Sequence, residues 1–326
     1  MSTAAFLYYL HEYVFKYGGS TLIIVGTISC ILNLMVFTRN NLRKNPCTIY
    51  LIAINIIDLS YIYSAFFLLI LASGYNIDPT TYSTFFCRFR YYIGFILLVY
   101  EPSCLILASV DRTLITSRNA ATRRHSTCRM AVINIIAVCV FWTIFHIHVW
   151  IGMQILQFGP NIFVCYFNPG AYETFISYYT LMIHGAVLPS LMLTFGFWTW
   201  KNLRRVRHAT QSGRTTNTAV VTTGRPQILQ TKDQQLIRMV LMEIMVYILC
   251  KYPIVIFHIY QEITEYNEKS PERQLIEQNL VILTIFTSSI ENCISCYTNA
   301  IVSKTFRLEL KRLLKNILQM FCCQRC

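Results

Sequence analysis

The sequence predicts an all-α membrane protein, built as a bundle of seven transmembrane helices with an amphipathic helix after the last of them. Two observations support this fold class. The chain of 326 residues is 55% hydrophobic and only 13% charged, whereas an average soluble domain is about 25% charged. Its apolar residues also gather in runs of roughly 20 residues or more, the length that a helix needs to cross a bilayer. A cytosolic enzyme, a nucleic-acid-binding protein and a disordered scaffold are therefore poor fits, although the net charge is +13.

Seven apolar runs follow one another along the chain. They cover residues 18–38, 45–77, 91–110, 130–172, 174–200, 239–261 and 278–303, and the fourth span occupies the first two thirds of its run. The short alternating segments of a membrane β-barrel are not seen. We therefore divide the chain into a short extracellular tail (1–19), a seven-helix membrane domain (20–303) and a cytoplasmic segment with an amphipathic helix and a Cys-rich tail (304–326).

The lysines and arginines predict the orientation of these spans, because the cytoplasmic loops of membrane proteins carry an excess of both residues. With the N-terminus outside, most of the 28 lysines and arginines fall in inner segments, and Lys251 lies within a span. The outer segments hold only Lys16, Arg88, Arg90, Lys269 and Arg273. The sequence thus predicts an extracellular N-terminus and a cytoplasmic C-terminus.

Residues 304–321 predict an amphipathic helix that lies on the inner membrane leaflet. The apolar side chains that share one face are Phe306, Leu310, Leu313, Leu314 and Ile317. A helix with such a face and basic residues opposite it binds a lipid surface. Cys322 and Cys323 follow, and cysteines beside a membrane are typical sites of S-palmitoylation. The alternative is that they are spare thiols.

Motifs that carry enzyme chemistry are absent from the sequence. It contains no G-x-S-x-G, Walker A or G-x-G-x-x-G pattern. It also lacks the H-E-x-x-H spacing of zinc ligands, although several histidines fall in the spans. We therefore expect no enzymatic activity, no cofactor, no metal ion and no nucleic-acid partner.

Characteristic residues occur in order, each in its own span. They are Asn33 in the first, Asp58 in the second, Asp111-Arg112-Thr113 at the end of the third, Trp142 in the fourth, Pro189 in the fifth and Pro253 in the sixth. With these motifs the chain resembles the rhodopsin-like family of G-protein-coupled receptors along nearly its whole length, and residues 303–307 resemble the start of that family's helix eight. The resemblance implies a plasma-membrane receptor that transduces an extracellular ligand to a heterotrimeric G protein through outward movement of helix six. Trp142, Pro189 and Pro253 would serve as helix pivots.

The resemblance also implies roles for residues at both ends of the third span. The family joins the residue at Cys87 to that at Cys165 by a disulfide, which an oxidising outer compartment preserves. At the inner end Arg112 would form a latch with its neighbour Asp111 and with Asp233, which precedes the sixth span. Breaking the contact with Asp233 would let helix six swing outward and expose a G-protein site. The alternative is that Arg112 is an ordinary boundary arginine whose charge reaches water.

Ionisable residues inside spans indicate an internal polar site, because a charge in the bilayer is costly unless it is paired or hydrated. The candidates are Asn33, Asp58, Glu101, Lys251, Glu291 and Ser295. By the resemblance, Asp58, Glu101 and residues 291–295 face one water-filled pocket, which binds sodium in many relatives. Three carboxylates this close do not all ionise easily, so either Lys251 neutralises one or one holds a proton. We hypothesise a Lys251–carboxylate bridge that substitutes for sodium. The alternative is that Lys251 and Glu291 point into the ligand cavity and never meet.

The sixth and seventh spans depart from the family pattern. Lys251 stands where the family usually has tryptophan, and Ser295, Cys296 and Asn299 replace the residues of the Asn-Pro-x-x-Tyr motif. Glu243, also in the sixth span, is expected either to reach toward Arg112 or to be a hydrogen-bonded core residue. These departures leave open a constitutively quiet or divergent receptor.

The ligand class is indicated mainly by exclusion. Gly94 stands where amine receptors of the family keep an aspartate, and residues 278–303 lack the lysine that opsins need for retinal. The outer segment 262–277 is rich in glutamate and would attract cationic ligands, unless it is simply a solvated loop. The resemblance is closest to peptide-type or orphan invertebrate receptors. By carry-over, the residues that face the ligand pocket are Arg90, Gly94, Phe257, His258 and Gln261.

Two other functions remain open. The buried carboxylates and Lys251 would suit the proton relay of a membrane transporter or ion channel, although the internal repeats typical of transporters are not evident. The altered seventh span would suit an interaction protein that does not signal. Nucleotide exchange on a G protein that is lost in Arg112→Ala would favour a receptor, whereas ion flux independent of a G protein would favour transport.

Overall fold

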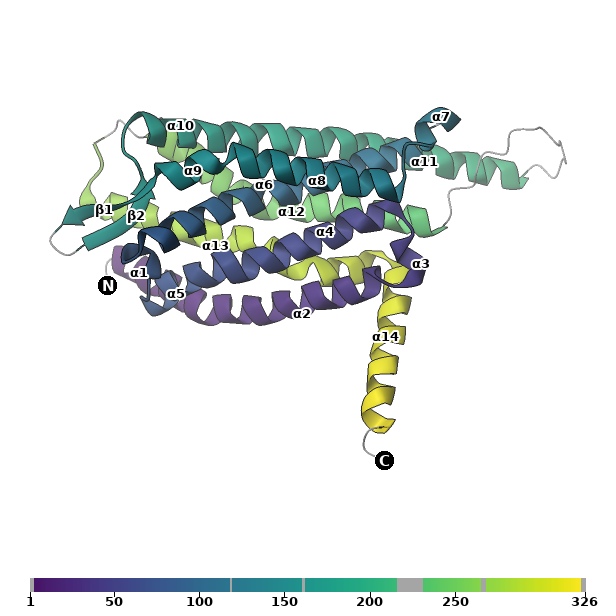
Figure 1. Ribbon diagram of the computed structural model, residues 1–326, viewed down its shortest axis with the longest axis horizontal. Coiled ribbons are helices and arrows are strands. Elements are labelled where there is room, and N and C mark those ends of the chain that lie inside the picture. The colour runs from purple at the N-terminus through teal and green to yellow at the C-terminus, as the bar shows by residue number, and fades with distance from the viewer. Residues whose placement is uncertain (1–2, 118, 160–161, 216–230, 265–267, 324–326) are drawn as a thin grey trace.

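The computed structural model describes residues 3–117, 119–159, 162–215, 231–264 and 268–323. Within these ranges the chain forms a bundle of long helices that run side by side, with one β-hairpin at one end and a helix that leaves the bundle at the other (Figure 1). Seven of its helical units are long and apolar enough to cross a membrane. The predicted seven-helix membrane bundle is therefore confirmed.

Three of the seven spans are interrupted by a π-helical segment. The first span comprises α1 (Thr3–Tyr13), a π-helix (Val14–Gly19) and α2 (Ser20–Phe37), and the second α4 (Pro46–Tyr61), a π-helix (Ile62–Phe66) and α5 (Phe67–Tyr75). The third is α6 (Thr84–Ile115), and the fourth α8 (Cys128–Phe145) with α9 (Ile147–Gly152). The fifth comprises α10 (Ala171–Thr180), a π-helix (Leu181–Val187) and α11 (Leu188–Thr215). The sixth is α12 (Thr231–Ile263) and the seventh α13 (Pro271–Val302).

Short elements connect the spans. They are α3 (Asn40–Arg43), a 3₁₀ turn (Pro79–Thr81), α7 (Ala120–Arg123) and the strands β1 (Met153–Gly159) and β2 (Ile162–Phe167). Several spans begin at a residue whose side chain accepts a hydrogen bond from the first turn, namely Asn45 before α4, Thr127 before α8 and Ser270 before α13. Such caps satisfy backbone N–H groups that have no partner within the helix.

The first helix begins earlier than the sequence predicted. Residues 1–19 were expected to be an extracellular tail, but the chain is helical from Thr3 and continues without a break into α2. Phe15 is fully buried and its ring lies 5.4 Å from that of Phe286. At Gly19, an added Cβ would lie only 2.8 Å from the side chain of Ile70. Contacts with α13 and α5 thus hold this segment against the bundle.

A two-stranded hairpin follows the fourth span, where the sequence analysis predicted no strand. β1 and β2 pair antiparallel, with Ile155 opposite Cys165. Residues 130–172 form one uncharged run in which the change from helical to strand geometry leaves no clear periodicity. Residues 159–161 (Gly-Pro-Asn) are of types that favour turns, but they were not interpreted as a hairpin turn. We call the end of the bundle that carries these strands the hairpin end and the opposite one the α14 end.

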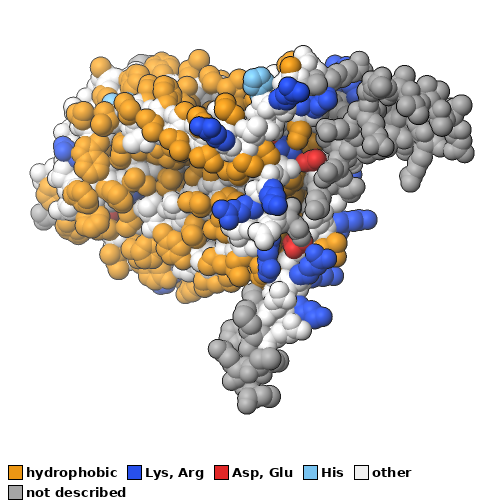
Figure 2. All heavy atoms as spheres, turned by 45° about the vertical axis from the view of Figure 1, so that its right-hand side comes forward, with side chains coloured by type: hydrophobic (Ala, Val, Ile, Leu, Met, Phe, Trp, Pro, Cys, Tyr) orange, Lys and Arg blue, Asp and Glu red, His pale blue; other side chains and the backbone are white. Residues whose placement is uncertain are grey.

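The central and peripheral helices differ strongly in burial. In the apolar window of α6, 56% of the residues are buried, against 11% in the window of α8 and α9. α6 therefore runs through the middle of the bundle, and α8 lies at its edge. Figure 2 shows hydrophobic side chains over the flank of the bundle, and lysine and arginine side chains gathered near the α14 end.

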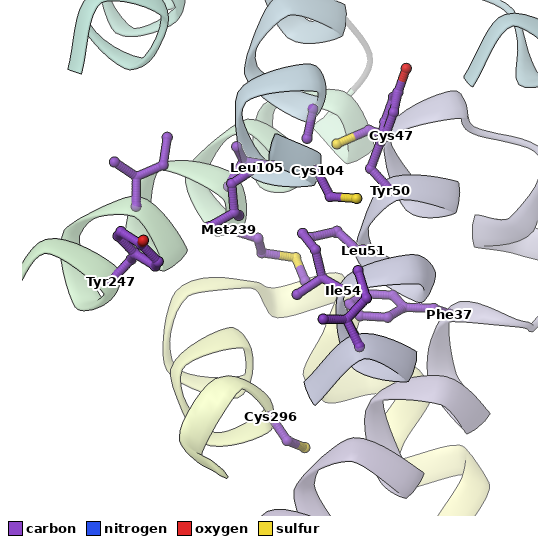
Figure 3. Close-up of a cluster of buried hydrophobic side chains, with 14 of the residues drawn as sticks. Phe37, Cys47, Tyr50, Leu51, Ile54, Cys104, Leu105, Met239, Tyr247 and Cys296 are labelled. Carbon is purple, nitrogen blue, oxygen red and sulfur yellow. The ribbon is translucent and has the colours of Figure 1, made fainter. Parts of the chain in front are cut away.

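An apolar layer crosses the bundle toward the α14 end. It includes Leu51 and Ile54 of α4, Leu105 of α6 and Met239 of α12 (Figure 3). Along each of these helices the layer falls between a polar residue near the helix end and a second one deeper in the span. It therefore separates the two polar clusters described below.

The last helix, α14 (Lys304–Cys323), leaves the bundle at a steep angle to the spans (Figure 1). Phe306 and Leu313 are buried, and the ring of Phe306 lies 5.6 Å from that of Phe37 on α2. Leu308 and Leu314 are exposed together with basic residues. The helix therefore rests on the bundle through one side and leaves apolar side chains uncovered on another.

Candidate functional site

A disulfide closes the hairpin end of the bundle. Cys87, in the first turn of α6, is bonded to Cys165 of β2, with a Cα–Cα distance of 5.6 Å. Both cysteines pack in a small apolar cluster with Val149, Met153 and Ile176. The predicted disulfide is confirmed, and it fixes the hairpin to the start of the most central helix.

Arg112 lies completely buried at the α14 end of α6. Its guanidinium donates to the carboxylate of the adjacent Asp111, and its Nη1 lies 3.4 Å from Oδ1 of Asp233 on α12. Asp111 also accepts a hydrogen bond from the hydroxyl of Ser126. The side chain of Arg112 is therefore directed inward to two carboxylates and does not extend to the surface.

Asn45 is a member of this group that the sequence analysis missed. Its Oδ1 accepts hydrogen bonds from Nη2 of Arg112 at 2.9 Å and from the backbone N–H of Cys47 at 3.1 Å. Its Nδ2 donates to Oδ1 of Asp233 at 2.7 Å. The only sequence signal was an asparagine before Pro46, which indicates a helix cap. We call Asn45, Asp111, Arg112 and Asp233 the Arg112 cluster.

A second cluster lies deeper in the bundle and is centred on Asn292 of α13, which falls within the predicted range 291–295 but was not singled out as a site residue. The Nδ2 of Asn292 donates to Asp58 Oδ1 and to Glu101 Oε2, both at 3.1 Å. Its Oδ1 accepts a hydrogen bond from Nζ of Lys251 at 3.3 Å. One amide thus joins side chains from α4, α6 and α12. We call these four residues together with Glu291 the internal site.

Lys251 and Glu291 approach each other within the internal site. The Nζ of Lys251 lies 3.6 Å from Oε2 of Glu291, and 5.8 and 5.7 Å from the ring centres of Tyr61 and Tyr247. Asp58 and Glu101 are each only 1% exposed. The structure therefore pairs the lysine with Glu291 and connects it to Asp58 and Glu101 through the side-chain amide of Asn292.

Asn33 and Ser295, which the sequence analysis placed with the internal site, form a hydrogen-bonded group with Asn55. The Nδ2 of Asn33 donates to Asn55 Oδ1 at 2.8 Å and to Ser295 Oγ at 2.7 Å. The hydroxyl of Ser295 lies 3.3 Å from Asn55 Oδ1. This group links α2, α4 and α13 beside the carboxylates.

Glu243 of α12 takes the simpler of its two predicted roles. Its Oε1 accepts a hydrogen bond from Nδ2 of Asn299 on α13 at 2.9 Å. Asn299 stands at the tyrosine position of the family motif, so an asparagine–glutamate contact between α12 and α13 occupies that place.

The three predicted pivots lie in different environments. Trp142 donates from Nε1 to the hydroxyl of Ser103 at 3.1 Å. Pro189 follows the π-helix of the fifth span, and Pro253 lies inside α12. A proline within a helix removes a backbone hydrogen bond. The helical hydrogen bonding of α12 is therefore interrupted at Pro253, two residues after Lys251.

The predicted ligand-pocket residues fall into two groups at the hairpin end. On α6, Arg90 lies 3.8 Å from Asp78, and the space around a Cβ added at Gly94 is open to 4 Å. On α12, His258 and Gln261 are half-buried, and the ring of Phe257 packs on Tyr260. In the part of the chain that the structure describes, no hydrogen bond or ion pair joins the two groups.

The glutamate-rich segment is partly neutralised. Glu277 accepts from Nζ of Lys269 at 2.7 Å, from Nε of Arg273 at 3.0 Å and from the hydroxyl of Tyr260 at 2.8 Å. This glutamate is paired within the protein and is not available to attract a cation. The side chains of Cys322 and Cys323 lie outside the described residues.

Comparison with known protein families agrees with this arrangement. The model of the 7 transmembrane receptor (rhodopsin family) matches residues 30–295, well over half of the chain. The chain therefore belongs to the rhodopsin family of seven-transmembrane receptors, as its motifs predicted. A search of curated proteins found no match.

Proposed function

We propose that this membrane receptor transduces an extracellular ligand to a heterotrimeric G protein at the plasma membrane, with its hairpin end outside the cell and its α14 end in the cytosol. The observation that carries the proposal is the Arg112 cluster. It joins the ends of α4, α6 and α12 through one fully buried arginine. The excess of lysine and arginine near the α14 end supports the orientation.

The mechanism follows from the contacts of Asp233. This residue belongs to α12 but bonds to Arg112 of α6 and to Asn45 of α4. While these contacts hold, the end of α12 is closed against the bundle. A ligand that favours a structure without them shifts the population toward an open end, at which a G protein binds.

The internal site has a different proposed role. Lys251 places its Nζ 3.6 Å from Glu291 and, through Asn292, next to Asp58 and Glu101, in the region where many relatives bind a sodium ion. We propose that this lysine substitutes for the ion. Sodium would then have little influence on signalling, and Lys251→Met would make the receptor sodium-sensitive. Unchanged activity and sodium response in that variant would contradict the substitution.

We also propose a peptide as the ligand and a membrane contact for α14. The open space near Gly94 and the missing amine anchor support a peptide as the ligand. The exposed leucines and basic residues of α14 support contact with membrane lipid, and palmitoylation of Cys322 and Cys323 would strengthen that contact.

Reconstituted receptor and a panel of G proteins test the proposal directly. We expect basal nucleotide exchange to rise in Asp233→Asn, because the latch is weakened, and to fall to background in Arg112→Ala. Arg129→Ala, at an exposed position on α8, is the matched control. Ion flux through the reconstituted protein without a G protein would instead favour a transporter or channel that uses the buried carboxylates and Lys251 as a relay.

A further inference from the structure

Gln235 of α12 contacts the first turn of α14 and takes no part in either polar cluster. Its Oε1 accepts a hydrogen bond from the hydroxyl of Ser303 at 2.9 Å and a second from the backbone N–H of Thr305 at 2.6 Å. The side chain is half-buried beside a small cavity lined by Phe37 and Phe306. It therefore binds a different helix from its own.

These contacts complete the cap of α14. The first N–H groups of a helix have no acceptor within that helix, and a residue just before the helix commonly supplies one. Ser303 does so for the N–H of Phe306, at 3.1 Å. The N–H of Thr305 is satisfied by Gln235, from a helix that lies far away in the sequence.

Ser303, which caps the N–H of Phe306, is itself hydrogen-bonded to Gln235, which caps the N–H of Thr305. The backbone of Ser303 is extended, with φ −113° and ψ 117°, at the point where α13 ends. Its hydroxyl oxygen accepts a hydrogen bond from the backbone N–H of Phe306, and the same hydroxyl donates a hydrogen bond to Oε1 of Gln235. Loss of the Gln235 oxygen thus removes one acceptor from Thr305 and the orienting acceptor from Ser303.

We propose that Gln235 is a positioning residue that makes the first turn of α14 depend on the position of α12. Gln235 lies two residues after Asp233, at the same end of the helix. A movement of α12 that separates Asp233 from Arg112 also withdraws Gln235 from Thr305 and Ser303. The first turn of α14 then loosens as the G-protein side opens. The link to signalling rests on the proposed function, but the cap itself does not.

The chemistry of the contact gives variants that separate it from packing. Gln235 acts only as an acceptor here. Gln235→Met keeps a side chain of similar length but removes the acceptor. Gln235→Glu keeps the acceptor and adds a negative charge at a helix N-terminus, where it is favourable. The two variants should therefore change α14 in opposite directions, which a purely steric role would not do.

Hydrogen–deuterium exchange of the full chain in lipid nanodiscs, without a G protein, measures the cap. We expect the amides of residues 304–307 to exchange roughly fivefold faster in Gln235→Met, in line with the loss of a helix cap. In Gln235→Glu they should exchange at the wild-type rate or more slowly. Gln319→Ala, at an exposed position on α14, should change nothing there. Equal rates in wild type and Gln235→Met, or fast exchange in Gln235→Glu, would overturn the proposal.

A second variant tests the coupling to α12. Asp233→Asn leaves Gln235 in place but weakens the latch, so the same amides should exchange faster than in wild type. Acceleration in Gln235→Met without acceleration in Asp233→Asn would overturn the coupling. G-protein activation is read separately: a chain that never stimulates nucleotide exchange contradicts the proposed function, while the amide rates still decide the cap.

Discussion

The Arg112 cluster and the internal site both bury charge in the same bundle, but they are built differently. In the Arg112 cluster one guanidinium meets two carboxylates, and two of its members, Asn45 and Asp233, lie near helix ends. In the internal site one ammonium pairs with one of three carboxylates, and the residue that joins it to the other two, Asn292, lies within α13. One cluster can be opened by moving the end of a helix, and the other cannot.

Because of this difference, substitutions in the two clusters should have different effects. Asp233 is near water, so its charge is readily solvated when the contact with Arg112 breaks. The carboxylates of the internal site stay in the bundle whatever the ends of the helices do, and a buried charge without a partner is strongly destabilising. We therefore expect changes in the internal site to lower stability, with the sodium response of Lys251→Met as their effect on signalling, and changes in the Arg112 cluster to alter basal activity.

The largest effect is expected from Lys251→Met. The substitution keeps most of the side-chain volume but removes the ammonium that pairs with Glu291 and lies in a group of three buried carboxylates. We expect the free energy of unfolding to fall by about 3–5 kcal/mol, measured by thermal unfolding in detergent or nanodiscs. Arg312→Met, whose side chain is 66% exposed beside Glu309, should cost less than about 1 kcal/mol. Similar losses in both variants would contradict the comparison.

A smaller loss is expected from Asn292→Leu. This variant leaves Asp58 and Glu101 without the amide donor, and each unsatisfied buried acceptor costs roughly 1–3 kcal/mol. The unfolding temperature should fall, whereas basal G-protein activation should not rise. A variant that is as stable as wild type, or one that is constitutively active, would show that Asn292 is not the structural centre of the internal site.

The smallest change in stability, with the clearest change in activity, is expected at Asn45. Asn45→Ala removes the cap of α4, worth about 1 kcal/mol, and also the contacts with Arg112 and Asp233. Asn45→Ser retains a capping oxygen but loses the amide donor to Asp233. Both variants should raise basal nucleotide exchange, and only the alanine variant should lose stability. Asn316→Ala, at an exposed position on α14, serves as the control.

The sequence predicted the parts of the molecule that depend on local patterns. The seven spans follow from apolar runs, and Cys87 and Cys165 from their places in a recognised family. The apolar pattern did not show where the first helix begins, nor that a β-hairpin follows the fourth span. In both regions aromatic and β-branched residues are compatible with more than one local structure, and contacts such as that of Phe15 with Phe286 decide between them.

The polar partners were harder to predict because their roles arise between helices. Asn45 has the signature of a helix cap and fills that role, but its other hydrogen bonds go to α6 and α12. Asn292 and Gln235 carry no motif, and each is bonded to residues far away in the chain. The charged residues inside spans could be recognised from the sequence because a charge in the bilayer is costly. The neutral amide side chains that hydrogen-bond to them carry no such signal.

The distance between the ends of α4 and α12 tests the central claim most directly. Spin labels introduced through unnatural amino acids at Arg43, the last residue of α3 just before α4, and at Arg238 of α12, both exposed, report this distance without use of the native cysteines. The account predicts a single short distance in wild type and a second, longer population in Asp233→Asn and in Asn45→Ala. An unchanged distribution in both variants, whatever their activity, would contradict the claim that the Arg112 cluster holds α12 closed.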